Sequence, residues 1–251
     1  MSKYVNYLLL SAIIACMPLV SFAGTNLAPD DPVGISFWII SVAMVAATAF
    51  FFLESLRVQG KFRTSLVVGG LICLVAGVHY FYMREVWAAT GSSPTVFRYV
   101  DWIVTVPMQM IEFYLILAAV TAVSLGVFWR LLIGTVVMVV AGYLGEAGFI
   151  DTTIGFVVGM AGWAYILYEI FSGEASASAS KAAPAVQSAF NTMKWIVTIG
   201  WAIYPLGYFL GYLAGGTDDA TLNIVYNVAD FINKIGFCLA IWAAATTQAD
   251  A

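Results

Sequence analysis

The sequence predicts an all-α membrane protein, a single-domain bundle of seven transmembrane helices. The first observation is composition: 62% of the 251 residues are hydrophobic, 10% are charged, and the mean hydropathy is +0.93. Soluble proteins are roughly half apolar and about a quarter charged, so lipid has to cover much of this surface. The second observation is a series of seven apolar runs of about 20 residues or more. Because these runs do not alternate at period two, a transmembrane β-barrel is excluded.

The first 23 residues have the pattern of a cleaved signal peptide. Lys3 precedes an apolar run over residues 8–20, and Ser21-Phe22-Ala23 follows with small residues at two of its three positions. The mature domain would then be 24–251, with its N-terminus outside the cytoplasm. The alternatives are an uncleaved membrane segment and, ranked lower, lipoprotein-type cleavage at Cys16.

The seven expected spans follow the apolar runs in order. They cover residues 33–56, 64–87, 95–120, 127–147, 153–171, 186–213 and 221–245. Polar, Gly/Pro-containing or Ser/Ala-rich segments separate them, at 57–63, 91–94, 173–184 and 215–219. Pro107 and Pro205 fall inside spans, which membrane helices tolerate because neighbouring helices satisfy the freed carbonyl groups.

The distribution of cations predicts the orientation. With the first long loop inside, six cations lie on the cytoplasmic side: Arg57, Lys61, Arg63, Arg130, Lys181 and Lys194. The outer ends carry mainly acids, with Arg84 as their one cation. This positive-inside bias agrees with an exported N-terminus and places the C-terminus in the cytoplasm. A net charge of −4 with scattered cations excludes a nucleic-acid partner, and the absence of a Cys/His cluster predicts no metal site.

Ionisable residues inside the predicted spans are the candidate functional groups, because burying them in lipid is costly unless they are paired. Arg98 and Asp101 are three residues apart and share one helix face. Lys234 lies near the expected bilayer centre, one turn inward of Asp230. The pair is either a structural ion pair or a reactive site, because burial favours a neutral amine that can condense with an aldehyde. Asp101 and Asp230 would then supply counterions.

Glu112 and His79 stand apart from this cluster. Glu112 lies three turns from Asp101 on the same face and has no cation among its helical neighbours, so we expect it to rest protonated and to donate a proton. The alternative is that Glu112 only bonds a neighbouring helix. His79 is the single histidine. It is either structural or a hydrogen-bond partner of an aspartate on the third span.

Several segments resemble microbial rhodopsins of the proteorhodopsin type. They are RYVDWIVTVP at 98–107, AVQSAFNT at 185–192, GWAIYP at 200–205 and DFINK at 230–234. The resemblance runs along essentially the whole chain. It implies that Lys234 binds all-trans-retinal as a protonated Schiff base. It also implies that Asp101 is the proton acceptor, Asp230 the second counterion, and Glu112 the proton donor.

The same resemblance implies the remaining site residues. Arg98 would be an outer charge gate. His79 would pair with Asp101 and raise the proton affinity of Asp101, and Trp38 of a neighbouring protomer would reinforce this pairing. The retinal cleft would be lined by Trp102, Thr105, Trp163, Trp201 and Tyr204. Gln109 occupies the position where blue-absorbing members carry Gln and green-absorbing members Leu, which implies blue absorption. Phe156 stands where carotenoid-binding relatives have Gly, so no antenna pigment is expected.

These features predict a light-driven outward proton pump, which is an ion transporter and not an enzyme, in the bacterial inner membrane. Asp101, Thr105 and Glu112 form the pattern of outward pumps, and the family implies a pentamer or hexamer. Two alternatives remain open. One is a photosensory rhodopsin with a slow photocycle. The other is a transporter without retinal whose Lys234–Asp230 pair binds a solute.

Overall fold

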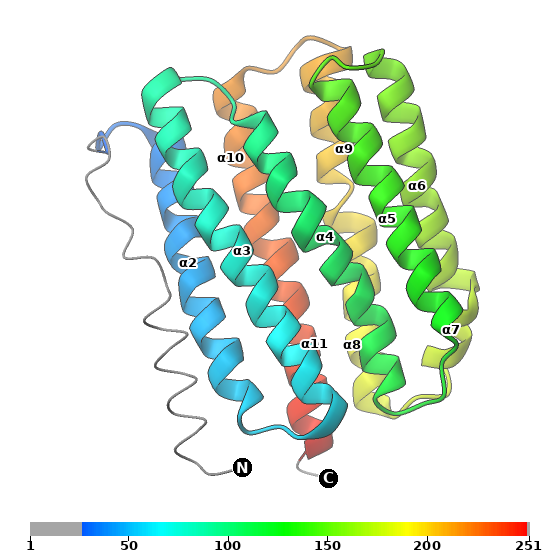
Figure 1. Ribbon diagram of the computed structural model, residues 1–251. Coiled ribbons are helices and arrows are strands. Elements are labelled where there is room, and N and C mark those ends of the chain that lie inside the picture. The colour runs from blue at the N-terminus through cyan, green and yellow to red at the C-terminus, as the bar shows by residue number, and fades with distance from the viewer. Residues whose placement is uncertain (1–26, 250–251) are drawn as a thin grey trace.

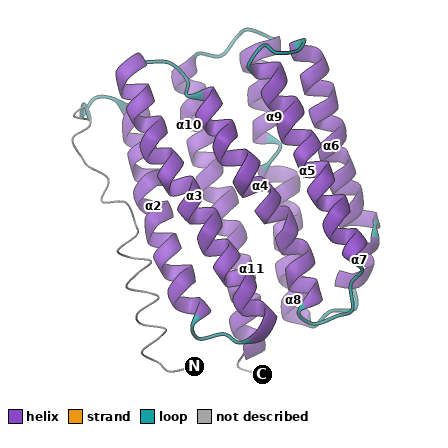
Figure 2. Cartoon of the chain, viewed as in Figure 1, coloured by secondary structure: helices purple, strands orange, loops and turns teal. Residues whose placement is uncertain are grey.

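The computed structural model describes residues 27–249 and contains a helical bundle (Figures 1 and 2). The predicted signal peptide, residues 1–23, lies outside the described residues. Seven helices in the described range are long and apolar enough to cross a membrane, and no strand occurs among these residues. The predicted fold class, a seven-helix multi-pass membrane protein, is therefore confirmed.

The first five spans are built from single or nearly continuous helices. They are α2 (Pro32–Ser55), α3 (Gly60–Thr90), α4 (Thr95–Ala118), α5 (Leu125–Glu146) and α6 (Thr152–Ser172), which α7 (Glu174–Ala179) extends. Polar caps determine where several of them begin. Asp31 accepts hydrogen bonds from two backbone N–H groups of α2, and Asp151 does the same for α6. Gly91, with φ +64°, ends α3 in the left-handed conformation that glycine adopts readily.

The last two spans are interrupted by π-helical turns. The sixth consists of α8 (Pro184–Trp195), η1 (Ile196–Gly200), α9 (Ile203–Tyr208) and η2 (Phe209–Leu213). The seventh consists of α10 (Asp219–Asp230), η3 (Phe231–Gly236) and α11 (Phe237–Ala249). A π-helical turn is commonly associated with a functional site. The sequence prediction located both spans but not these interruptions.

The seven spans pack side by side in one bundle. In Figure 1, α4 lies between α3 and α5, and the sixth and seventh spans lie behind it. The α5–α6 pair packs closely through glycines, because a Cβ atom on Gly162 would lie 2.9 Å from the carbonyl oxygen of Gly134. Large apolar side chains such as Ile39 and Ile199 face outward, as expected for a lipid-facing surface. The polar residues of the third and seventh spans are directed into the bundle instead.

Candidate functional site

The centre of the bundle holds a buried lysine between two carboxylates. The Nζ of Lys234 contacts Oδ2 of Asp101, from α4, and lies 3.1 Å from Oδ2 of Asp230. The side chains of all three residues are at most 2% exposed. The π-helical turn η3 carries Lys234 and follows Asp230 directly, so the two side chains are presented on one face. The structure thus brings together the predicted cluster.

The two carboxylates have different surroundings. Asp230 accepts hydrogen bonds from the hydroxyls of Tyr80 at 2.8 Å and Tyr204 at 2.6 Å, in addition to Lys234. Asp101 meets Lys234 through Oδ2, whereas its Oδ1 has no hydrogen-bond partner among residues 27–249. The lone pairs of Asp230 are therefore largely occupied, and Asp101 keeps one oxygen that can take a proton.

Arg98 lies one helical turn from Asp101 on α4 and is held by neutral partners. Its guanidinium donates to Asn223 at 2.8 Å, to Asn227 at 3.0 Å and to the hydroxyl of Tyr80 at 3.3 Å. The sequence prediction grouped Arg98 directly with the two aspartates. In the structure Tyr80 lies between them, because its hydroxyl accepts from Arg98 and donates to Asp230.

Glu112 occupies a separate buried position further along α4. Its side chain is fully buried, and neither carboxyl oxygen has a hydrogen-bond partner in the described part of the chain. Ser65 from α3 lies beside it. A charged carboxylate without a partner is costly in such surroundings, so a neutral carboxylic acid is the form that this site accommodates. This agrees with the isolation expected from the sequence.

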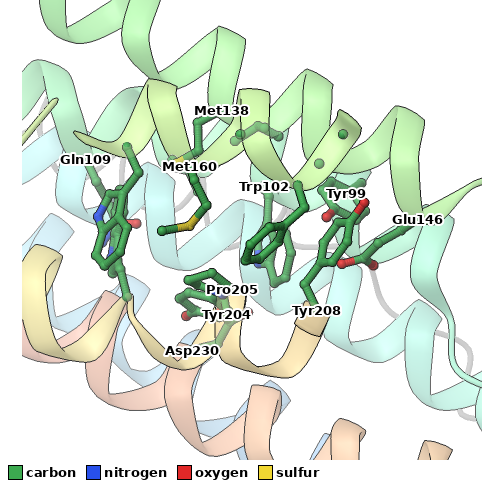
Figure 3. Close-up of a pocket in the computed structure, with 18 of the residues that line it drawn as sticks. Tyr99, Trp102, Gln109, Met138, Glu146, Met160, Tyr204, Pro205, Tyr208 and Asp230 are labelled. Carbon is green, nitrogen blue, oxygen red and sulfur yellow. The ribbon is translucent and has the colours of Figure 1, made fainter. Parts of the chain in front are cut away.

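An apolar cavity of about 100 Å³ borders the lysine (Figure 3). Five of the six residues that we expected to line a cleft or tune its ligand do line it: Trp102, Gln109, Trp163, Trp201 and Tyr204. Thr105 does not. It is fully buried, and its hydroxyl bonds back to the carbonyl of Asp101 at 3.0 Å, as threonine does inside a helix.

The chemistry of this cavity fits retinal. Met138, Met160 and Pro205 add apolar surface, and Figure 3 shows Trp102 and Tyr204 with their rings at the cavity wall. Of the described lysines, Lys234 alone is buried, which places a primary amine at the edge of a slot lined by flat rings. A conjugated aldehyde needs this combination of an apolar slot and an amine.

His79 is half-buried on α3 and bonds its own helix. Its Nδ1 lies 2.9 Å from the carbonyl oxygen of Val75. A carbonyl only accepts, so Nδ1 carries a proton and Nε2 is left for another partner. A direct hydrogen bond to an aspartate does not occur among the described contacts, although His79 is close enough to Asp101 to interact electrostatically. Trp38 packs against Phe81, with the guanidinium of Arg84 4.7 Å from its ring.

Sequence reasoning missed several polar residues of the site. Tyr80, Asn223 and Asn227 hold Arg98 and Asp230, and Asn233 bonds residues of α9 and η1. For Asn223 and Asn227 the spacing was the available signal, because residues 223, 227, 230 and 234 follow one another at three or four positions along one helix face. Glu146, at the end of α5, also lines the cavity, beside Tyr99 (Figure 3).

Comparison with known proteins identifies similar chains. Residues 31–248 match the family model of bacteriorhodopsin-like proteins. The blue-light absorbing proteorhodopsin of Gamma-proteobacterium Hot 75m4 is 51% identical over 96% of both chains. The green-light absorbing proteorhodopsin of Gamma-proteobacterium EBAC31A08 is 50% identical over 96% of this chain and 97% of its own. The crystal structure of a blue light-absorbing proteorhodopsin from Med12 is 54% identical, with a TM-score of 0.75, over 86% of this chain and 98% of that one. The predicted resemblance to proteorhodopsins is confirmed.

Proposed function

This chain belongs to the bacteriorhodopsin-like protein family, and from that premise we propose that it is a light-driven outward proton pump with retinal attached to Nζ of Lys234. The observation that carries the proposal is the buried Lys234 placed between Asp101 and Asp230 at the wall of an apolar cavity. All-trans-retinal bound there would supply light absorption and an isomerisation that changes the proton affinity at Nζ.

The rest of the proposed mechanism concerns the protein's own groups. Lys234 holds a proton at Nζ, directly against Oδ2 of Asp101. Because Asp230 already accepts from Tyr80 and Tyr204, Asp101 is the carboxylate that takes the proton. Trp102, Trp201 and Tyr204 keep water from the cavity side of this pair.

The direction of proton transport follows from the groups at the two ends of the proton path. The buried acid of Glu112 lies on the cytoplasmic side and returns a proton to Nζ of Lys234. Arg98 lies on the outer side, fixed by Asn223 and Asn227, and its positive charge opposes return of a proton from outside. A mature N-terminus outside, a cytoplasmic C-terminus and insertion in the bacterial inner membrane complete the proposal, on the positive-inside bias of the loops.

Colour and assembly are also proposed. Gln109 lines the cavity, and its amide would favour the ground-state charge distribution of the chromophore, giving blue absorption. Phe156 packs against Tyr208 with ring centroids 5.3 Å apart, and we expect no antenna carotenoid because carotenoid-binding relatives have Gly at this position. We expect a pentamer or hexamer in which Trp38 of one copy meets His79 of another.

A single-turnover experiment tests this order of proton movements. The purified protein with all-trans-retinal is placed in oriented membranes with pH-sensitive dyes on both sides and excited by one laser flash. We expect a proton to appear on the outer side and a later uptake from the cytoplasmic side. Proton release and uptake on the same side would refute the pump and favour the photosensory alternative. A colourless protein would refute the retinal site.

A further inference from the structure

Two π-helical turns face each other next to the site, and both expose backbone carbonyls that a regular α-helix would pair internally. In η1 the N–H of Trp201 bonds the carbonyl of Ile196, five residues back. Pro205 has no N–H, and the N–H of Tyr204 bonds Trp201 at 3.1 Å. In an α-helix that N–H would bond Gly200. In η3 the N–H of Phe237 bonds Lys234 in place of Asn233.

Side chains from other spans take the place of the missing backbone donors. Nδ2 of Asn233 donates to the carbonyl of Gly200 at 3.0 Å, across the gap between the seventh and sixth spans. Nε2 of Gln109, from α4, donates to the carbonyl of Asn233 at 3.0 Å. Nε1 of Trp163, from α6, donates to the carbonyl of Val197 at 3.0 Å. Both turns are therefore tied to residues of the cavity wall.

Asn233 is the central residue of this arrangement. It is 1% exposed, and its Oδ1 has no hydrogen-bond partner in the described part of the chain. A Cβ atom on Gly200 would collide with that oxygen, so glycine at position 200 makes room for the Asn233 side chain. Its Nδ2 also lies 3.2 Å from the hydroxyl of Tyr204, which donates to Asp230 at 2.6 Å. One hydrogen-bonded chain thus connects the Lys234–Asp230 pair with the sixth span.

We propose that Asn233 is a positioning residue that latches η1 of the sixth span to η3 of the seventh. Movement of α8 away from α11 has to break the bond from Asn233 to Gly200. The latch responds to the site because Tyr204 accepts from Asn233 and donates to Asp230, and loss of the proton from Nζ of Lys234, 3.1 Å from Asp230, alters both bonds. Asn233 thereby couples proton transfer at Lys234 to opening of the cytoplasmic half of the bundle, a role that rests on the proposed pump function.

Amide hydrogen exchange on the protein without retinal tests the latch independently of pumping. The full chain is purified in lipid nanodiscs as wild type, Asn233→Ala, Asn233→Ser and Thr198→Ala. The control removes a bond within a single span, because the hydroxyl of Thr198 donates to Lys194 at 2.7 Å. We expect exchange over residues 196–204 to rise about tenfold in Asn233→Ala, as expected when a buried hydrogen bond is lost. Asn233→Ser keeps a hydroxyl donor, so we expect an intermediate rate.

The outcomes separate the latch from the pump. Equal exchange over 196–204 in wild type, Asn233→Ala and Thr198→Ala would overturn the latch. If Asn233→Ala does not fold, the comparison uses Asn233→Ser, and a rate equal to the wild-type rate would overturn the latch in the same way. With retinal added, we expect the late proton-uptake step to become several times faster in Asn233→Ser. Failure of pumping in the wild type would refute the proposed function and leave the exchange result standing.

Discussion

Replacing Asp101 with Asn should destabilise the protein as well as stop pumping, because it leaves the buried cluster with an excess positive charge. Lys234 and Arg98 carry two positive charges, and Asp101 and Asp230 carry two negative charges. All four residues are at most 2% exposed. Breaking a buried pair by removing one partner costs about 3–5 kcal/mol. Asp230 remains 3.1 Å from Nζ of Lys234, so we expect the lower end of that range, about 3 kcal/mol.

Thermal unfolding of the retinal-free protein in nanodiscs measures this loss. For a chain of this size, about 3 kcal/mol corresponds to a decrease of roughly 6–12 °C in the unfolding midpoint. The double variant Asp101→Asn/Lys234→Met should lose less stability than the sum of the two single variants, because the unpaired charge is also removed. An unchanged midpoint for Asp101→Asn, or strictly additive losses in the double variant, would refute the assigned charge balance.

Three further predictions follow from other parts of the structure. Glu112→Gln should slow proton uptake after a flash about 10²-fold or more, because an amide cannot donate the proton. An unchanged rate of proton uptake in this variant would contradict the donor role. Gln109→Leu should move the absorption maximum to longer wavelength, and an unchanged spectrum would remove Gln109 from colour tuning. The N–H and hydroxyl of Thr221 both bond the Asp218 carboxylate at 2.9 Å, which lowers the pKa of Asp218 below its usual value. This contribution to stability is present above the unfolded-state pKa and is lost as the pH falls through the folded-state value, so the difference in unfolding midpoint between wild type and Asp218→Asn should shrink below about pH 4. If the unfolding midpoints of wild type and Asp218→Asn differed by the same amount at every pH, this prediction would be contradicted.

Length and hydropathy were sufficient to predict the seven spans, because a bilayer requires apolar helices of a set length. The ends of the spans differ from the predicted ones by a few residues in most cases. At α2 and α6, for example, capping by Asp31 and Asp151 starts the helix one residue before the predicted span. The larger difference is at the fifth span, which continues through α7 to Ala179. At this end of the fifth span, Glu169 and Glu174 both form ion pairs with Arg130. Because their charges are paired, the chain continues as a helix beyond the apolar run.

The charged members of the site were also predictable, because a charge in a span is rare and costly. Helix periodicity placed Arg98, Asp101 and Glu112 on one face of the third span, as observed. Uncharged partners were not predictable in this way. Asn233 and Tyr80 act through contacts across spans whose register the sequence alone does not specify. Thr105 is another example. Its place on the interior face of the third span was predictable, but the sequence did not show whether its side chain bonds its own helix or lines the cavity.

The measurement that tests the central claim most directly is the light-induced pH change of a suspension of cells that express the chain with all-trans-retinal. We predict that illumination acidifies the medium, that a protonophore abolishes the signal, and that Asp101→Asn cells with the same amount of coloured protein give none. A coloured wild-type protein that leaves the pH unchanged, or that makes the medium alkaline, would contradict outward proton pumping.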